Sequence, residues 1–406
     1  MAESQPPLWR TPLFVIIAGC IIAMVGFGVR SVLGLFLEPM TEARGWGREI
    51  FGLAMAIQNL LWGIGVPIAS AIADRLGPSR VLGAGALIYA IGVWGMATTT
   101  SSMGLHLFGG LLTGLGIAFT AFSIVLASLA KVVGPERRSL VLGLGTAAGS
   151  FGQVVFSPLG QLFISQFGWY SALVILAAST LIIIPLALVL PSSEAHPGEA
   201  ASDQSIGEAV TEAARHRGFV LLTVGFFVCG FHVAFITVHF PAYVKDLGLA
   251  AEVGAYSIAI IGLFNIVGSF ASGAAGQRWS KKGGLAFIYF TRALVITALL
   301  LAPKTETTIY LFAAAMGLLW LSTVPLTSGI VAQVFGVRYM ATLFGIVFFS
   351  HQLGSFLGVW LGGRLYDTTG TYDTVWWAGV VLGVTAALIH LPINEKPLPR
   401  LAPENA

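Results

Sequence analysis

Charge is scarce in this chain. Only 10% of the 406 residues are Asp, Glu, Lys or Arg, whereas 56% are hydrophobic and the mean hydropathy is +0.87. Because a soluble domain carries about 25% charged residues, this composition excludes an ordinary soluble fold and predicts an all-α membrane protein with many spans. The net charge is only +3 and no basic face is clustered, so nucleic acid is not expected as a partner.

Cysteines and cofactor motifs are equally sparse. Cys20 and Cys229 both fall inside apolar segments, which does not indicate a disulfide framework. The sequence has no Gly-x-x-x-x-Gly-Lys-Ser/Thr loop, so ATP is not expected to drive the protein directly. His232 and His239 are seven residues apart, too far for two metal ligands on one helix. We therefore expect no enzyme activity, no metal and no cofactor.

Acidic residues are missing from the apolar segments. All eighteen Asp and Glu lie in or beside predicted loops, yet Arg30 and Arg292 sit within long apolar runs. A lone charge at the centre of a membrane helix costs roughly 2.5–3.5 kcal/mol on insertion scales. No intramembrane carboxylate is there to neutralise these arginines, so the natural partner of one of them is an anion that binds and leaves.

The apolar runs are each long enough for a span of about 20 residues. The first, from about residue 13 to 37, exceeds the core of a signal peptide and is expected to remain as a span. A polar stretch at 191–217 separates an N-terminal six-helix bundle (1–190) from a C-terminal one (218–406) and includes a short surface helix over Ser205–Arg215. The twelve predicted spans are 12–37, 50–73, 80–98, 104–131, 139–166, 169–190, 218–244, 253–275, 283–302, 308–334, 341–365 and 373–391.

The distribution of Lys and Arg predicts the orientation. Of the 21 basic residues, two lie inside spans and fourteen fall in the termini and the loops on the same side. Since basic residues favour the cytoplasmic side, we expect a multi-pass protein of a bacterial inner (plasma) membrane with both termini cytoplasmic and a short cytoplasmic tail. The five remaining basic residues, in outer loops, are Arg44, Arg48, Lys245, Lys304 and Arg364.

The two halves are related in sequence. Gly26-Phe-Gly-Val is echoed by Gly230-Phe-His-Val, 204 residues later, and Asp74-Arg75 corresponds to Gln277-Arg278 after 203 residues. Three glycines of the fifth span recur in the eleventh span at a constant offset of 202 residues. Two parallel six-helix repeats with a site near the membrane midplane are a transporter architecture. The three glycine pairs are Gly143 with Gly345, Gly152 with Gly354, and Gly160 with Gly362.

Two local patterns carry a family resemblance. The stretch Ser70-Ala-Ile-Ala-Asp-Arg-Leu-Gly-Pro-Ser-Arg80 resembles the loop signature Gly-x-x-x-Asp-Arg-x-Gly-x-x-Arg of the major facilitator superfamily. Val29-Arg30-Ser31 looks like the first-helix pattern of the monocarboxylate transporters, with Arg30 in the place of a lysine. The sequence from Gly362 to Asp373 is similar to this group and to oxalate/formate antiporters. The resemblance implies a carboxylate carrier.

One departure from that pattern concerns coupling. The animal monocarboxylate carriers have an Asp and, four residues later, an Arg in their eighth helix, and these positions correspond here to Asn265 and Ser269. Proton symport at that site is therefore in doubt. His232, His239 and His351 could handle a proton instead, because histidine titrates near pH 6.5. The alternative is that each is a neutral imidazole hydrogen-bonded between helices.

We take Arg30 as the first candidate for substrate binding. Its planar guanidinium matches a carboxylate bidentately, while the alternative is a side chain that snorkels outward or caps a carbonyl. For Arg292, a structural role with neighbouring carbonyls or Tyr289 is at least as plausible. Other candidate polar contacts for the substrate are His232, His239, Asn265, His351 and Gln352.

A different kind of site is expected where the second span meets the cytoplasm. The family pattern assigns Asp74, Arg75 and Arg80 to a gating lock on the inner face. A carboxylate there can pair with a cation and with the N-terminus of a facing helix in one conformation and release them in another. The alternative is that these charges only set the topology.

The sequence thus predicts a secondary transporter of a small organic anion, with a monocarboxylate as the expected substrate, working by alternating access with protons as a candidate coupling partner. Its other partner is the lipid bilayer, and a monomer is the default. An exporter of neutral or aromatic small molecules is the alternative; a cation exporter would need an acidic residue inside a span, and none is present. A sensor or scaffold with a transporter fold is a further alternative.

Overall fold

The computed structural model describes residues 11–133, 135–191, 205–336 and 338–401, and over these ranges the chain forms helices and no strand. The first half contains α1 (Pro12–Val32), η2 (Leu33–Phe36), α2 (Leu37–Arg44), α3 (Arg48–Leu76), α4 (Pro78–Thr98), α5 (Ser102–Leu105), η3 (His106–Leu112), α6 (Thr113–Phe119), α7 (Phe122–Lys131), α8 (Pro135–Thr180) and α9 (Ile183–Ala187). The rest contains α10 (Ile206–Arg215), α11 (Arg217–Asp246), α12 (Ala251–Arg278), α13 (Lys281–Leu301), α14 (Glu306–Leu319), α15 (Thr323–Phe335), α16 (Met340–Thr369), α17 (Asp373–His390) and η4 (Pro399–Leu401).

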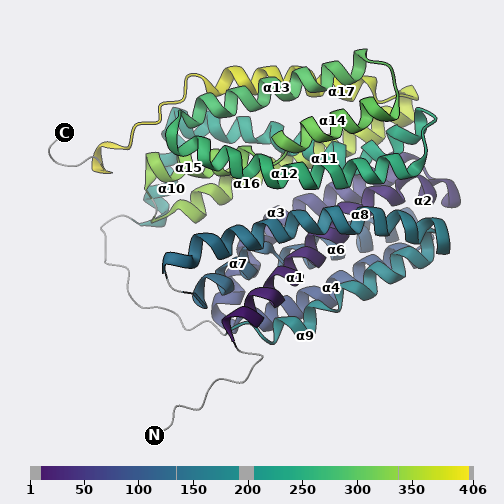
Figure 1. The fold of residues 1–406 in the computed structure, drawn as a ribbon, viewed down its shortest axis with the longest axis horizontal. Helices are drawn as coiled ribbons and strands as arrows, with labels where there is room; N and C mark the ends of the chain where they lie inside the picture. Colours follow the sequence, from purple (N-terminus) through teal and green to yellow (C-terminus); the bar gives the residue numbers. More distant parts are fainter. Residues whose placement is uncertain (1–10, 134, 192–204, 337, 402–406) are drawn as a thin grey trace, which may run out of the picture.

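The helices form two bundles that lie side by side (Figure 1). Helices α1 to α9 make up one bundle and α11 to α17 the other, each with its own cluster of buried apolar side chains. We call the end of the molecule that carries α2 the α2 end, and the opposite end, which carries α10, the α10 end. The spans run between these two ends, so every loop lies at one of them.

Eleven helical segments of the described chain are long and apolar enough to cross a membrane. One of them, from Gly143 to Ala187, has 45 residues and would be about 67 Å long as a single helix, twice the thickness of the bilayer core. The backbone of Gly168 breaks it with φ 76° and ψ 162°, a conformation that glycine adopts readily.

The contacts on either side of Gly168 show that the chain turns back there. The Trp169 ring lies 5.4 Å from the Arg44 guanidinium at the α2 end, whereas the Leu190 carbonyl accepts a hydrogen bond of 3.4 Å from Ser79 at the α10 end. The long segment is therefore two crossings, and the prediction of twelve spans is confirmed.

The fourth and tenth spans are both broken. Helix α6 ends before Thr120, and α14 ends before a short irregular stretch that finishes at Ser322. The helix ends at Phe119 and Leu319 are 200 residues apart, and the next helices begin at Phe122 and Thr323, 201 residues apart, close to the offset of 202 seen for the glycines of the fifth and eleventh spans. The repeat visible in the sequence is thus also a repeat of helix interruptions, and such interruptions need polar groups to satisfy the freed backbone.

The surface helix expected over Ser205–Arg215 is present as α10. Its N-terminus is a capping box, in which Ser205 and Glu208 bond each other's backbone N–H groups. The donors of Ser205 lower the pKa of Glu208. Arg400 of the C-terminal segment forms an ion pair of 2.9 Å with Glu212, so that segment is held against α10.

Candidate functional site

Arg30 lies inside the protein, on α1 within the first bundle. Its side chain is only 9% exposed, and Nη2 donates a hydrogen bond of 2.8 Å to Oδ1 of Asn59 on α3. The guanidinium also lies over two rings, 4.4 Å from the centroid of Trp62 and 5.7 Å from that of Phe27. Cation–π contacts of this kind stabilise a desolvated cation by about 2 kcal/mol.

The charge of Arg30 is not neutralised by the protein around it. No carboxylate among the described residues forms an ion pair with Arg30; the four ion pairs there involve other side chains. Its one hydrogen-bond partner among them, Asn59, is itself fixed by donating to the Met55 carbonyl at 2.8 Å. A guanidinium has five N–H donors, so most of the donors of Arg30 remain available to a further acceptor.

The surroundings of Arg30 reach across to the second bundle. Trp62 of α3 packs edge-to-face on Phe348 of α16, with centroids 5.4 Å apart. Phe348 in turn stacks on His351, with centroids 5.6 Å apart and planes within 13°. Arg30 is therefore joined by two aromatic rings to a histidine of the other half.

His351 and Gln352 form a small polar group on α16. Nδ1 of His351 is 3.1 Å from Oε1 of Gln352, and the Ser355 hydroxyl donates to the same oxygen at 3.2 Å. The amide nitrogen of Gln352 is buried without an acceptor among the described atoms, and a side chain at Gly63 of α3 would meet the Gln352 side chain at 2.6 Å. The structure thus brings Arg30, His351 and Gln352 to the contact between α3 and α16.

The other two histidines predicted for the site lie elsewhere. The ring of His232 points towards α17, where Nε2 is 2.8 Å from the Gly379 carbonyl. His239 bonds the Val359 carbonyl of α16 at 2.8 Å and the Tyr372 hydroxyl at 3.1 Å, close to the α2 end. The two residues share a helix, but α11 is buried on nearly all sides, so they meet different neighbours.

Asn265 lies at a junction between the two bundles. Its amide nitrogen donates to Ser150 of α8 at 3.0 Å, and its oxygen accepts from the backbone N–H of Leu321 at 3.0 Å. Leu321 belongs to the interruption between α14 and α15, so Asn265 satisfies a backbone donor freed by that break. It is part of the helix packing rather than of the group around Arg30.

Arg292 of α13 binds backbone carbonyls at the same interruption. It is 0% exposed, and Nη2 donates to the Leu319 carbonyl at 2.6 Å and to the carbonyl of Trp320. These are terminal carbonyls of α14, where the helix dipole is negative. Nε and Nη1 of Arg292 are buried without a hydrogen-bond partner among the described atoms. The bonds of Nη2 agree with the structural role considered for Arg292.

The comparisons with known proteins agree with this architecture. The model of the Major Facilitator Superfamily matches residues 19–359. This chain belongs to the Major Facilitator Superfamily. It is therefore a membrane transporter and not an enzyme, and its all-helical fold of two six-helix bundles is that of the family.

Relatives from this superfamily cover nearly the whole chain. Monocarboxylate transporter 13 of Rattus norvegicus is 27% identical over 403 residues, which are 96% of this chain and 91% of that protein. The uncharacterized MFS-type transporter YcxA of Bacillus subtilis (strain 168) is 24% identical, over 95% of this chain and 96% of its own.

Solved structures share the fold at low sequence identity. The bacterial homologue of the human lysosomal transporter Spinster, in an inward-facing and unoccupied conformation, has a TM-score of 0.77 at 16% identity and covers 96% of this chain and 97% of its own. The D-xylose-proton symporter has a TM-score of 0.71 at 15% identity, over 96% of this chain and 100% of its own.

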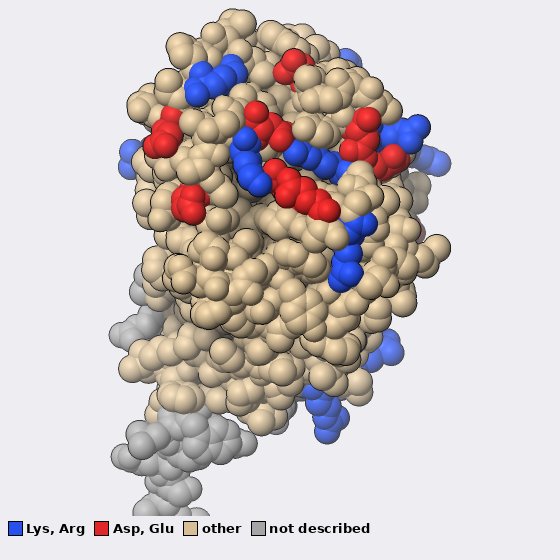
Figure 2. All heavy atoms as spheres, turned by 90° about the vertical axis from the view of Figure 1, so that its right-hand side faces the viewer, with Lys and Arg blue, Asp and Glu red and all other residues tan. Residues whose placement is uncertain are grey.

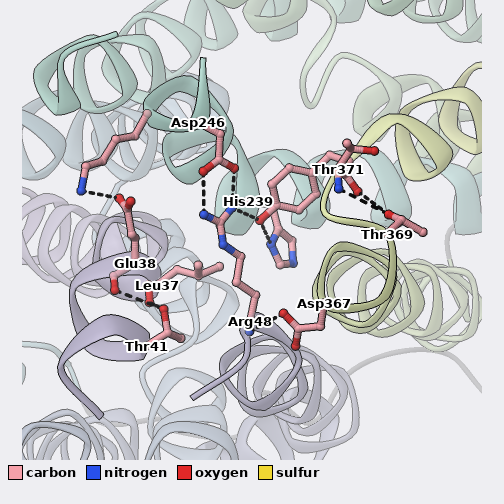
Figure 3. A network of polar contacts seen from close by, with 11 residues as sticks. Leu37, Glu38, Thr41, Arg48, His239, Asp246, Asp367, Thr369 and Thr371 are labelled. Atoms are coloured by element: carbon pink, nitrogen blue, oxygen red, sulfur yellow. Dashed lines mark hydrogen bonds and ion pairs between the residues drawn. The ribbon is translucent and has the colours of Figure 1, made fainter. Parts of the chain in front are cut away.

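Sequence reasoning missed a charged network that joins the bundles of this superfamily member at the α2 end. Basic and acidic side chains gather next to one another on that face (Figure 2). At its centre, Arg48 of α3 binds the carboxylate of Asp246 on α11 through both terminal nitrogens, at 2.6 and 2.7 Å. Nη1 of Arg48 also donates to the Tyr372 hydroxyl at 3.0 Å, which is the hydroxyl that His239 contacts (Figure 3).

Further pairs surround this central one. Lys245 binds Glu38 at 2.9 Å, and Arg364 binds Glu49 at 3.0 Å. In each case one partner lies in residues 38–49 and the other in the second bundle. We call these residues, together with Arg48, Asp246 and Asp367, the α2-end network. The sequence carried a signal for this network, because every basic residue of the loops at this end has an acid within three residues of it.

The predicted gating residues at the opposite end are exposed. Asp74, Arg75 and Arg80 have solvent-facing side chains and form no ion pair with another described residue. The side chains of Arg137 and Arg138, considered as their partners, lie outside the described part. In this structure the bundles are thus joined by ion pairs at the α2 end, whereas at the α10 end Asp74 has no ion-pair partner among the described side chains.

Proposed function

We propose that this chain moves a small monocarboxylate across a bacterial inner membrane by alternating access, with Arg30 binding the carboxylate. The observation that carries the proposal is a guanidinium, 9% exposed, whose hydrogen-bond partner is a neutral amide. A buried guanidinium with unused N–H donors is stabilised when an anion pairs with its charge and accepts hydrogen bonds from those donors. Monocarboxylate transporters among the relatives support the same class of substrate.

The remaining contacts supply roles for neighbouring residues. Asn59 holds the guanidinium from α3, and Trp62 and Phe348 provide apolar walls for the body of the substrate. His351 and Gln352 lie on the second bundle, where a bound anion would draw the halves together. His351 is the histidine best placed to exchange a proton with that site, since His232 faces α17 and His239 contacts Tyr372 beside the α2-end network.

Residues 1–190 and 218–406 then act as two bodies joined by the linker 191–217. With both termini cytoplasmic, as the distribution of Lys and Arg favours, the α2 end faces outward and the structure is closed on that side. Asp74, Arg75 and Arg80 are the lock expected to form when the cytoplasmic side closes instead. We propose that a monomer performs this cycle.

A second candidate is export of a neutral or aromatic compound. It is favoured by the rings of Phe27 and Trp62, which lie against the Arg30 guanidinium, and by that of Phe348, which packs on Trp62. These rings would also suit an uncharged flat molecule. The two candidates differ in what they require of Arg30, because only an anion needs its charge.

Uptake by purified protein in proteoliposomes tests the proposal. The panel consists of labelled lactate, pyruvate, formate, oxalate and an aromatic acid, each with and without a pH gradient, beside a neutral aromatic compound. We expect saturable uptake of at least one monocarboxylate and competition by others. Transport of the neutral compound alone would favour the second candidate, and no flux of any compound would favour a sensor or scaffold.

A further inference from the structure

The N-terminus of helix α3 is capped by the other bundle. Helix α3 starts at Arg48, and the residue before it, Gly47, has no side chain that could cap the helix. The carboxylate of Asp367, near the end of α16, takes this place: Oδ1 accepts from the backbone N–H of Arg48 and Oδ2 from that of Glu49, both at 2.8 Å. Figure 3 shows Asp367 beside the backbone of Arg48.

Two glycines allow the end of α16 to come this close to the start of α3. A side chain at Gly47 would overlap the carboxylate of Asp367, and one at Gly363 would meet the carbonyl of Arg48 at 2.5 Å. The end of α16 and the start of α3 are therefore shaped for each other. A carboxylate at a helix N-terminus gains from both the free N–H groups and the helix dipole.

The same residue of α3 is held twice by the second bundle. Asp246 binds the side chain of Arg48, and Asp367 binds its backbone. The first contact can persist while a flexible arginine moves, whereas the second requires the helix ends themselves to touch. Separation of the bundles at the α2 end must break the contact of Asp367.

We infer that Asp367 is the residue that sets how firmly the α2 end stays closed, by capping α3 across the two halves and releasing it when that end opens. The inference rests on the proposed alternating access, but it concerns the conformational balance and does not depend on which substrate is carried. Asp74 stands at the matching place at the other end, two residues before the last residue of α3, as Asp367 stands two residues before the last residue of α16.

Thiol labelling in nanodiscs tests the inference, because both faces of the protein are then reachable. The parent is the full chain with Cys20→Ser and Cys229→Ser, and the reporter is Ala242→Cys. Ala242 is 3% exposed, lies one turn before Asp246, and packs in the core cluster of the first bundle. It is therefore covered while the α2 end is closed. Thr374→Cys, exposed at the same end, reports the intrinsic rate of labelling.

We expect Asp367→Asn to raise the labelling rate of the Ala242→Cys reporter about five- to tenfold, because the charge and one of the two acceptors are lost. Gly47→Ala should act in the same direction by pushing the carboxylate away. The matched control is Asp373→Asn, which removes an exposed charge from the same end and should leave the rate unchanged.

Two results would overturn the inference. One is an unchanged labelling rate in both Asp367→Asn and Gly47→Ala, and the other is an equal increase in Asp373→Asn, which would assign the effect to net charge. Since Gly47→Ala weakens the same contact without changing Asp367 itself, a poorly folded Asp367→Asn protein does not end the test. The labelling needs no substrate, so its outcome is separate from that of the uptake panel.

Discussion

The surroundings of Arg30 and of Arg292 differ in the partners that the protein itself offers to each guanidinium. Both arginines are buried in apolar helices, one in each bundle, and neither forms an ion pair with a described carboxylate. Arg292 donates to two carbonyls at the end of α14, so it meets the negative end of a helix dipole. Arg30 meets the neutral amide of Asn59 and two aromatic rings.

A buried charge alone therefore does not indicate a ligand-binding site. The carbonyls that bind Arg292 belong to the backbone and are present in every state that keeps the fold. The charge of Arg30 has no such backbone partner among the described residues, and this is why we propose it, and not Arg292, as the carboxylate site. Variants that change only one of the two arginines, or a single neighbour, can test this contrast.

The largest effect is expected for Arg30→Gln. Loss of the charge should lower Vmax/KM for the best monocarboxylate of the panel at least about 100-fold, since a buried charge pair is worth roughly 2–5 kcal/mol. Arg30→Lys should recover part of the activity, because lysine keeps the charge but not the planar fork. Proteoliposome uptake, normalised to folded protein, gives the measurement, and unchanged affinity in Arg30→Gln would refute the assignment.

The next largest effect is expected for Arg292→Gln, on stability instead of transport. Carbonyls of Leu319 and Trp320 would lose their donor, and each buried acceptor left unsatisfied costs about 1–3 kcal/mol. The thermal transition of the purified protein should fall by several degrees, while uptake per folded molecule stays within about twofold of the parent. Loss of uptake without loss of stability would instead move Arg292 into the transport pathway.

An intermediate effect is expected for Asn59→Leu. Arg30 would keep its charge but lose the hydrogen bond that orients it, and a bond to a charged group is worth about 1.5–3 kcal/mol. KM should rise about tenfold with a smaller change in Vmax. Gln58→Leu is the matched control, because Gln58 donates to the Gly109 carbonyl and not to Arg30; an equal rise in KM there would show that the effect is not specific.

The smallest effect is expected for His232→Gln. It removes a single hydrogen bond to the Gly379 carbonyl, worth about 1 kcal/mol, and should leave the pH profile of uptake as it is. His351→Gln is the informative partner variant, since it lies beside the Arg30 group and should change that profile. A profile altered only by His232→Gln would reverse the roles of the two histidines.

Much of the fold was accessible from the sequence, for physical reasons. Long apolar runs must cross the bilayer as helices, so the twelve spans and the α10 helix followed directly. Arg30 stood out because a charge in such a run is visible without a structure. Its partners did not, because Asn59 is 29 residues away in sequence and Phe348 belongs to the other bundle, so only the packing brings them together.

The sequence predicts the neighbours of a side chain less well when its helix is buried on nearly all sides. A spacing of seven residues puts His232 and His239 on the same face of a helix. Helix α11, however, has neighbours nearly all round, and periodicity does not say which neighbour each ring meets. The α2-end network was missed for another reason. Its charges lie at helix ends far apart in the chain, where a sequence shows their sign but not their pairing.

The carbonyl bonds of Arg292 also have a consequence for how the protein is made. Helix α13 carries this charge near its middle, and the carbonyls that satisfy it follow 27 and 28 residues later. During synthesis α13 therefore leaves the ribosome before its partner exists, with a charge that costs about 2.5–3.5 kcal/mol in lipid. We expect α13 to be retained at the translocon until α14 has been synthesised, and the two helices to enter the bilayer together as a hairpin.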